Sequence, residues 1–366
     1  MSVINFGTSI TLQQFAEAIA AVGRDVTIIG QGEPGIGKSA TLSALAGMLP
    51  EYETAYIDCT LLDLGDFALP YTEQVGAHKV TKFAPNARFK FHLDRPVIIM
   101  LDEIGKAMRS VKNVLLTLML EKRIGDHYLH PDSIVFGTTN LASDGVGDML
   151  EGHARNRVCV ATIAKPDAGF TPEGGIADDG WAQWAVGNGV APELIAWVKQ
   201  YPHALASYLD ESQKDNPYIW NPAKPGGQAV VTPRSLAKAS HIVKARATLG
   251  DGLAISLLCG TVGESAARDI QAFLTVVDKL DTWERITSTP EQARVPDDPA
   301  ARCLLVLNAM MRVDANTLTP WLTYLRRLDK EWQALFTTSV MKSGKQAICV
   351  KNRAFVDLAR DNQWVI

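Results

Sequence analysis

The sequence predicts an α/β domain with a five-stranded parallel sheet, followed by an all-helical region. Short apolar and β-branched runs alternate with segments of helix length in the first part of the chain; they span residues 26–29, 54–59, 97–101, 134–138 and 158–163. Continuous apolar strands that alternate with helices are typical of a parallel sheet covered on both faces. From residue 181 onward the apolar residues follow a helical spacing.

The size and composition favour a soluble protein of two or three domains in the cytoplasm. The chain has 366 residues, of which 47% are hydrophobic, and a net charge of −4. It therefore has ample core residues and no overall electrostatic attraction to nucleic acid or membranes. Its five cysteines are scattered singly and its seven histidines form no metal-binding pattern, so we expect reduced thiols and no zinc site. No run approaches the ~20 apolar residues of a membrane span, and no signal peptide is visible.

The first strand is preceded by a segment, residues 11–23, whose apolar residues have the spacing of an amphipathic helix. The strand itself leads into Gly32–Ser39, which fits the phosphate-loop pattern G-x-x-x-x-G-K-[ST]. A glycine-rich turn between a strand and a helix can wrap backbone N–H groups around phosphates. Lys38 would reach the β- and γ-phosphates, and the Ser39 hydroxyl would bind Mg²⁺. The sequence thus predicts a site for a nucleoside triphosphate.

The strand expected at residues 97–101 ends in two carboxylates, Asp102 and Glu103. The first carboxylate after a buried strand can hold Mg²⁺, usually through its waters, and the second can orient or deprotonate the attacking water. An acidic pair at a solvated strand end can also arise by chance, but the phosphate loop upstream argues against that reading.

Three further positions carry side chains that suit phosphate chemistry. Asn140 ends the strand run at 134–138 and could contact the γ-phosphate, although asparagine is also an ordinary turn former. Arg155 and Arg157 precede the last strand run; an arginine there could stabilise charge in phosphoryl transfer, and a solvated basic turn is the alternative.

Arg234 lies in the first turn of a helix that Thr232 caps and Pro233 begins. A cation in the first turn opposes the helix dipole, which makes sense where an anion such as the γ-phosphate binds. A surface salt bridge is the alternative.

Two breaks in the pattern divide the chain. Residues 165–180 contain two prolines and four glycines and are predicted to be a linker, and a second break falls at 287–299. We therefore expect a nucleotide-binding core at residues 1–165, a helical lid at 166–286 and a smaller helical C-terminal region of unknown role at 287–366.

Taken in order, these motifs resemble those of an AAA+ ATPase. The resemblance makes Gly32–Ser39 the Walker A loop, Asp102 and Glu103 the Walker B pair and Asn140 sensor 1. It further implies an arginine finger at Arg157 or Arg155 and sensor 2 at Arg234; Arg157 aligns with the usual R-F position, although Val158 replaces the phenylalanine. Such an enzyme hydrolyses ATP with Mg²⁺ held by Ser39 and Asp102. The residues expected to contact the nucleotide are Gly32, Glu33, Pro34, Gly35, Ile36, Gly37, Lys38, Ser39 and Ala40.

The finer resemblance is to the MoxR-like branch, which includes CbbQ-type activators and occurs in bacterial and phage genomes. It rests on the runs at 102–107 and 111–123, on 61–70, and on the lid segment from Trp181 to Leu236. The resemblance implies an insert hairpin at about 71–80 and a ring, usually a hexamer. It also implies remodelling of a protein client, often with a von Willebrand A domain companion.

Three functions remain open at this point. The first is a protein-remodelling ATPase that moves its insert loops, residues 71–80 and 123–132, against a client. The second is a DNA-directed motor or loader, which local basic residues keep open; these are Lys79, Lys82, Arg88 and Lys90. The third is a scaffold that binds ATP but scarcely hydrolyses it, against which the intact Glu103 argues.

Overall fold

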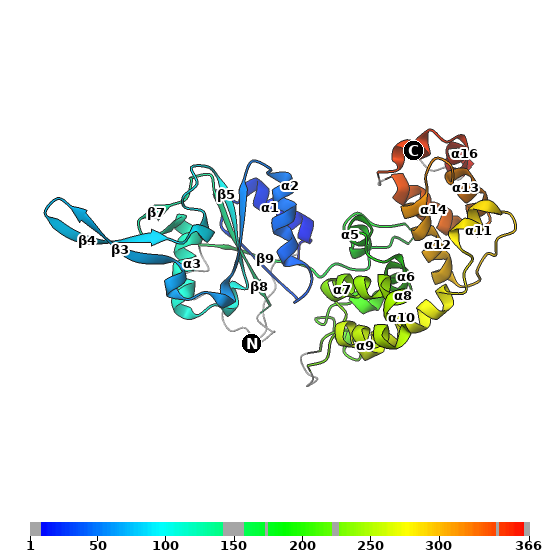
Figure 1. The fold of residues 1–366 in the computed structure, drawn as a ribbon, viewed down its shortest axis with the longest axis horizontal. Helices are drawn as coiled ribbons and strands as arrows, with labels where there is room; N and C mark the ends of the chain where they lie inside the picture. The colour runs from blue at the N-terminus through cyan, green and yellow to red at the C-terminus, as the bar shows by residue number, and fades with distance from the viewer. Residues whose placement is uncertain (1–8, 142–156, 173–174, 222–226, 342–343, 362–366) are drawn as a thin grey trace. The chain divides into compact units, whose positions relative to one another are not determined.

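The computed structural model describes residues 9–141, 157–172, 175–221, 227–341 and 344–361 (Figure 1). These residues form two compact units, residues 1–165 and residues 166–366. The first unit is α/β and the second is helical, which confirms the fold class predicted from the sequence.

The first unit is built on a five-stranded parallel sheet with the strand order β2-β5-β8-β1-β9. Its strands are β1 (Ile28–Gly32), β2 (Glu53–Asp58), β5 (Val97–Asp102), β8 (Ile134–Asn140) and β9 (Cys159–Thr162). All neighbouring strands in this sheet pair in parallel. Strands β5 and β8 are buried along their whole length, which explains why they appear in the sequence as unbroken apolar runs.

Successive side chains of each strand point to opposite faces of the sheet, so an apolar strand gives the sheet two apolar faces. Helices cover both of them. The three long helices are α1 (Leu12–Val22), α2 (Thr41–Met48) and α3 (Arg109–Glu121). Ile98 and Met100 of β5 pack in one cluster with residues of α1 and α2, whereas Ile99 and Leu101 pack in another with residues of α3. Helix α1 begins at a capping box in which Thr11 and Gln14 bond each other's backbone N–H groups.

Strand β1 begins and ends later than the run predicted at 26–29. It extends through Gly30 to Gly32, where its backbone pairs with β8 on one side and β9 on the other. A Cβ atom on Gly30 would lie 2.5 Å from the ring of Phe15. The apolar pattern stops at Ile29 because α1 packs directly on the glycine backbone, so the strand continues without apolar side chains.

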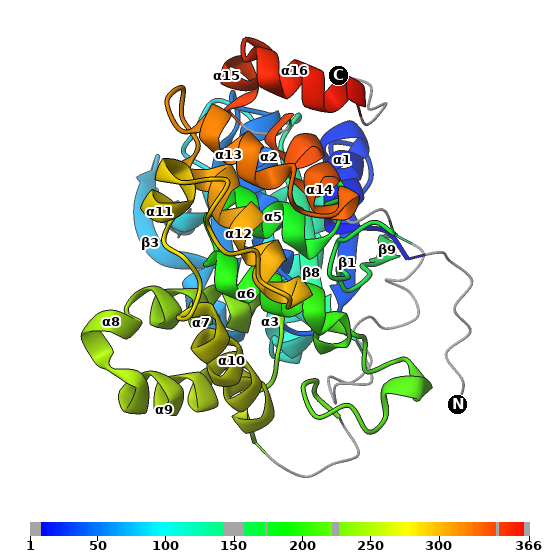
Figure 2. The same cartoon turned by 90° about the vertical axis from the view of Figure 1, so that its right-hand side faces the viewer.

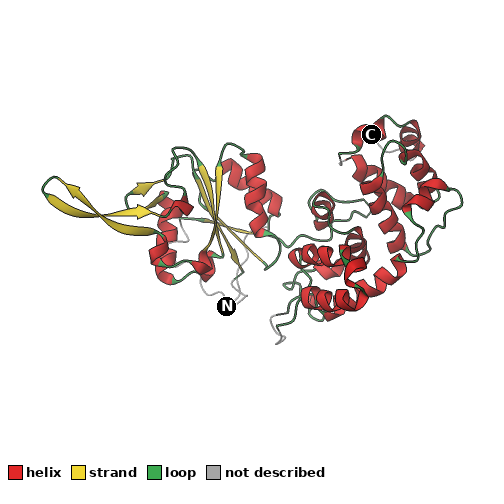
Figure 3. Cartoon of the chain, in the orientation of Figure 1, coloured by secondary structure: helices red, strands yellow, loops and turns green. Residues whose placement is uncertain are grey.

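Two antiparallel hairpins extend from the first unit (Figure 3). The longer one consists of β3 (Ala68–Val75) and β4 (His78–Pro85), turning at Gly76, and lies between β2 and β5 in the sequence. It is the insert hairpin expected at 71–80, but it has more residues in each strand. The shorter one consists of β6 (Arg123–Ile124) and β7 (His127–Tyr128), within the second predicted loop.

The second unit is helical in the part of it that the structure describes, apart from an isolated antiparallel bridge between Phe170 and Ile176. Its helices are α5 (Trp181–Gly187), α6 (Pro192–Gln200), α7 (Pro233–Lys244), α8 (Arg246–Leu249), α9 (Asp251–Val262), α10 (Glu264–Val277), α11 (Trp283–Ser288), α12 (Pro299–Arg312), α13 (Leu318–Leu325), α14 (Lys330–Met341), α15 (Gln346–Val350) and α16 (Arg353–Asp361). Helices α9 and α10 lie side by side, as do α15 and α16 (Figure 2). None of the described helices is long and apolar enough to cross a bilayer.

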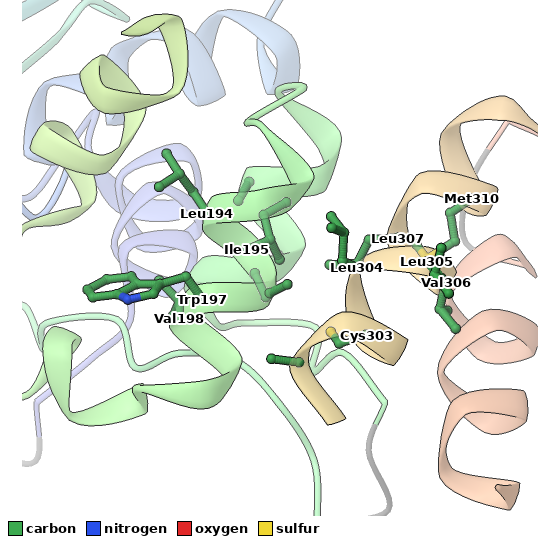
Figure 4. Packing of buried hydrophobic residues seen from close by; sticks show 14 of the residues in the cluster. Leu194, Ile195, Trp197, Val198, Cys303, Leu304, Leu305, Val306, Leu307 and Met310 are labelled. Atoms are coloured by element: carbon green, nitrogen blue, oxygen red, sulfur yellow. The ribbon is translucent and has the colours of Figure 1, made fainter. Parts of the chain in front are cut away.

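The two expected parts of this unit share one hydrophobic core. Helices α6 and α12 pack together, with Ile195 and Leu304 on their facing sides and Leu305 and Met310 on the other side of α12 (Figure 4). The boundary expected at residue 286 falls inside α11, where the side chain of Ile286 is fully buried. The structure therefore does not separate a lid from a C-terminal region at that residue, since burial continues across it.

Candidate nucleotide site

The predicted phosphate loop connects β1 to α2 at the carboxyl end of the sheet. Gly35 and Gly37 have φ angles of 76° and 107°, in the left-handed region that glycine adopts without a steric penalty. A short 3₁₀ turn, Lys38–Ala40, then leads into α2. Gly35 and Gly37 are thus explained by backbone geometry, and the turn directs the loop toward the start of a helix.

Lys38 is held inside this loop by hydrogen bonds. Its Nζ donates to the carbonyl oxygens of Gly32 and Glu33, each at 2.9 Å, and to Oδ1 of Asn140 at 2.8 Å. Only 5% of Lys38 is exposed. The parallel pairing of β1 with β8 places Gly32 opposite Asn140, which brings these residues together. Because a phosphate oxygen is a stronger acceptor than a neutral carbonyl or amide, Lys38 can transfer these hydrogen bonds to a bound triphosphate.

Asp102 receives hydrogen bonds from several hydroxyl groups. Oδ2 accepts from Ser39 Oγ at 3.1 Å and from Tyr56 OH at 2.8 Å, and Oδ1 accepts from Thr138. The Ser39 hydroxyl and the Asp102 carboxylate are oxygen ligands on adjacent elements, the kind of ligands that Mg²⁺ uses together with phosphate oxygens. The described residues contain no group of three or more His, Cys, Asp or Glu side chains that could hold a metal by themselves. As oxygen ligands on adjacent elements, Ser39 and Asp102 fit a magnesium ion shared with a nucleotide.

Glu103 follows β5 in an unusual backbone conformation. Its φ of 55° and ψ of 37° lie in the left-handed region, which costs of order 1–3 kcal/mol for a residue other than glycine. The turn begins the 3₁₀ segment Ile104–Lys106, and Lys106 Nζ lies 3.1 Å from Glu103 Oε2. Because backbone strain of this kind gathers at functional sites, the conformation of Glu103, next to Asp102, marks it as a candidate functional residue.

Glu33 of the phosphate loop forms a buried ion pair. Its Oε2 lies 3.8 Å from Nζ of Lys165, and the side chains are 6% and 5% exposed. Burial lowers the pKa of Lys165, and the charge of Glu33 opposes that shift. Lys165 is the last residue of the first unit, so this pair joins the phosphate loop to the point where the chain leaves the core.

Sequence reasoning missed four residues of this network, namely Tyr56, Lys106, Thr138 and Lys165. Tyr56 and Thr138 lie on the strands that flank β5. Both are polar residues near the ends of predicted strands, and this feature of the sequence could have identified them. A fifth neighbour, Cys59, is a buried thiol whose pKa is raised to about 12 by burial and by nearby carboxylates, Asp102 foremost. It is therefore unreactive.

Of the predicted arginines, only Arg157 can be placed relative to the phosphate loop. Arg157 is exposed and precedes β9, at the amino end of the sheet. Since Cys159 of β9 lies opposite Ile28 of β1, Arg157 is roughly 20 Å from the start of its own phosphate loop at the usual rise of a strand. Arg155 lies outside the described residues. Arg234 is exposed in the first turn of α7, behind the capping box of Thr232 and Ser235, in the second unit.

A family model matches the first part of the chain. The model of the ATPase family associated with various cellular activities (AAA) matches residues 28–160, a range that includes the phosphate loop, Asp102, Glu103 and Asn140. Residues 28–160 are an AAA ATPase domain. The AAA+ resemblance drawn from the motifs is confirmed for the core, whereas the MoxR-like branch stays a prediction. No curated protein matches the chain in sequence.

Solved structures give distant likenesses. The RuvB Holliday junction branch migration motor of Thermotoga maritima is 16% identical, with 86% of this chain and 85% of that chain covered and a TM-score of 0.35. A putative ATPase from Cytophaga hutchinsonii is 14% identical, with coverages of 74% and 91% and a TM-score of 0.32. At these TM-scores the likenesses carry no argument about function.

The AAA domain is an ATPase that uses ATP and Mg²⁺. A bound Mg²⁺ would neutralise charge on the phosphates, and the residues suited to hold it are Ser39 and Asp102. Lys38 is suited to bind the phosphates, and the Glu103 carboxylate to accept the proton of the attacking water.

Replacing Glu103 with glutamine should separate ATP binding from ATP hydrolysis. The amide keeps the shape of the side chain but cannot accept a proton, and loss of a general base costs about 10²–10⁴ in rate. Steady-state phosphate release and binding of a fluorescent ATP analogue measure the two steps. Hydrolysis within a few-fold of the wild-type rate would show that Glu103 is not the base.

Replacing Lys165 with methionine should destabilise the first unit by about 3–5 kcal/mol, because it leaves the Glu33 carboxylate buried without this cation. The double variant Glu33→Gln with Lys165→Met removes both charges and should recover much of that loss. Chemical denaturation measures the free energy of unfolding of each variant. Additive effects of the two single substitutions would contradict an energetic coupling between the two side chains.

Proposed function

We propose that this AAA ATPase is a MoxR-like ring motor that uses ATP hydrolysis in the cytoplasm to remodel or activate a partner protein. The observation that carries the proposal is the β3–β4 hairpin, which interrupts the core between β2 and β5. Its apolar side chains are exposed: Leu69 by 66%, Tyr71 by 44%, Val75 by 50% and Phe83 by 52%. A two-stranded hairpin that exposes such side chains suits contact with another polypeptide.

The pairing register places most of these side chains together. Residues directly opposite each other in an antiparallel pair lie on the same face, and the register sets Leu69 opposite Ala84 and Tyr71 opposite Lys82. Val75 follows on that face toward the tip, since side chains alternate along a strand. This arrangement supports a contact surface along one face of the hairpin.

The charges near the hairpin support a protein client over DNA. Four basic residues left the hypothesis of a DNA motor open, and three of them lie beside carboxylates. Lys82 Nζ is 2.9 Å from Glu73, Lys90 Nζ is 3.3 Å from Glu53, and Arg88 is 3.9 Å from Asp66. A nucleic-acid interface needs uncompensated cations that neutralise phosphates, so these pairs weaken that alternative.

A ring of subunits follows from the place of Arg157 if this arginine is the finger. At the amino end of the sheet it is too far from its own phosphate loop to touch that nucleotide, whereas a neighbouring subunit could receive it. We infer a homo-oligomeric ring, a hexamer by resemblance, in which Arg157 completes the site of the next subunit. Arg234 would contact the γ-phosphate from the second unit.

Mixing two inactive variants tests this arrangement. Glu103→Gln and Arg157→Ala should each hydrolyse ATP poorly, because a finger is worth about 10³–10⁵ in rate in related phosphoryl transfer. Mixed rings contain some interfaces with an intact Glu103 on one side and an intact Arg157 on the other, so activity should return as subunits exchange. Phosphate release that equals only the sum of the separate variants would exclude a finger given by a neighbour, and Arg155 would be tested next.

The nature of the client is tested by stimulation of ATP hydrolysis. An unfolded polypeptide should raise the rate, and the triple variant Leu69→Ser, Tyr71→Ser and Val75→Ser should lose that effect while it keeps the basal rate. The matched control is Thr72→Ser with Gln74→Ser, on the other face of the hairpin, which should respond as wild type. Stimulation by DNA that weakens steeply with salt would favour the DNA motor instead.

A further inference from the structure

We propose that the outer edge of β4, at Lys79 and Thr81, binds an extended acidic segment of polypeptide as an added strand. The hairpin carries two outer edges, since β3 and β4 form a two-stranded sheet among the described residues. This inference rests on the proposed function, because it names how the client is held. It concerns the backbone of the hairpin, whereas the proposed function concerns its side chains.

The direction of the backbone groups follows from one contact and two prolines. His127 Nε2 lies 2.5 Å from the carbonyl oxygen of Phe83; a carbonyl oxygen can only accept, so the ring donates and this carbonyl points away from β3. Pro70, opposite Phe83, has no N–H to exchange across the ladder, and neither has Pro85, opposite Ala68. Opposite pairs in an antiparallel ladder alternate between hydrogen-bonded and non-hydrogen-bonded. All three observations agree that the backbone groups of Phe83 and Pro85 point away from β3, and so do those of every second residue along β4.

The backbone groups of β4 that point away from β3 are blocked at the base of the hairpin and open toward its tip. At the base, Pro85 offers no donor and His127 covers the carbonyl of Phe83. Toward the tip, the same alternation makes Thr81 and Lys79 the outward residues, and both are exposed. Each of them presents a backbone N–H and a carbonyl to the side away from β3. The chemical complement of such an edge is the backbone of another extended chain.

The charge at this edge selects an acidic segment. On the other face of the hairpin, Lys82 is paired with Glu73 at 2.9 Å. No ion pair to a carboxylate of the described residues is present for Lys79, which lies at the open part of the edge. A carboxylate on the added strand would compensate that charge. The β3 edge carries Thr72 and Gln74 at its outward positions, neither of which supplies such a charge.

Lysine and proline also serve to keep free edges from self-association. That role predicts that removing Lys79 increases association between copies of the chain and leaves stimulation by polypeptide unchanged. The proposed role predicts a change in the response to polypeptide, so the two can be distinguished.

The test replaces single backbone donors. Thr81→Pro removes the outward N–H of β4 without removing a ladder bond, and should raise by about tenfold the polypeptide concentration needed for half-maximal stimulation of ATP hydrolysis, as expected for one lost hydrogen bond. Thr72→Pro makes the same change on the opposite edge and should have no effect. Thr81→Val keeps the N–H and should also respond as wild type. The ladder amides of Tyr71 and Lys82, protected from hydrogen exchange, report that the hairpin persists.

Charge and protection supply two independent measurements on the full chain. The amides of Lys79 and Thr81 should become protected from hydrogen exchange when an acidic unfolded polypeptide is added, and Lys79→Glu should shift the preference toward a basic one of matched length. If polypeptide stimulates the wild type and Thr81→Pro equally, the edge proposal fails and the proposed function stands. If no polypeptide stimulates the wild type, both fail.

Discussion

The parallel pairing of β5, β8 and β1 is the constraint on which the candidate site depends. In this order the carboxyl ends of three neighbouring strands meet at one edge of the sheet, and they supply Asp102, Asn140 and the phosphate loop. Residues separated by up to 102 positions in sequence thereby form direct hydrogen bonds, as Lys38 and Asn140 do. A shift of one residue in the pairing of β1 with β8 would move these side chains to opposite faces, so the buried apolar residues of the strands also fix the chemistry of the site.

Burial of charge at this edge has an energetic cost that the network offsets. Lys38, Asp102 and Glu33 are each at most 6% exposed, and an isolated buried charge would be strongly unfavourable. Lys38 has carbonyl and amide acceptors, Asp102 has hydroxyl donors, and Glu33 has the cation of Lys165. The same acceptors and donors hold the reactive groups in fixed positions, which is the preorganisation that phosphoryl transfer requires. Stability and function therefore depend on one set of contacts here.

Much of the site was predictable because its signals are local. The phosphate loop, the acidic pair after β5 and Asn140 after β8 each follow an apolar strand in sequence, and strand ends in a parallel sheet converge. Tyr56 and Lys165 carry no such signal: one is a half-exposed tyrosine on β2, and the other opens a segment rich in proline and glycine. Their roles depend on which strands become neighbours. The left-handed backbone of Glu103 was likewise invisible, because nothing in a strand–turn sequence marks it.

The order of the strands also determines where Arg157 and the β3–β4 hairpin lie relative to the nucleotide site. The side chains proposed to act on the nucleotide lie at the carboxyl end of the sheet, whereas Arg157 lies at the amino end. At the usual rise of a strand, the distance of roughly 20 Å to the start of the phosphate loop is longer than an arginine side chain. The hairpin leaves the core after β2, the strand that borders β5 and supplies Tyr56 to Asp102. A change in the bonding of Asp102 during hydrolysis would act on Tyr56 and so on β2. The hydrogen bond from Tyr56 to Asp102 therefore connects the candidate magnesium ligand to the strand that precedes the hairpin.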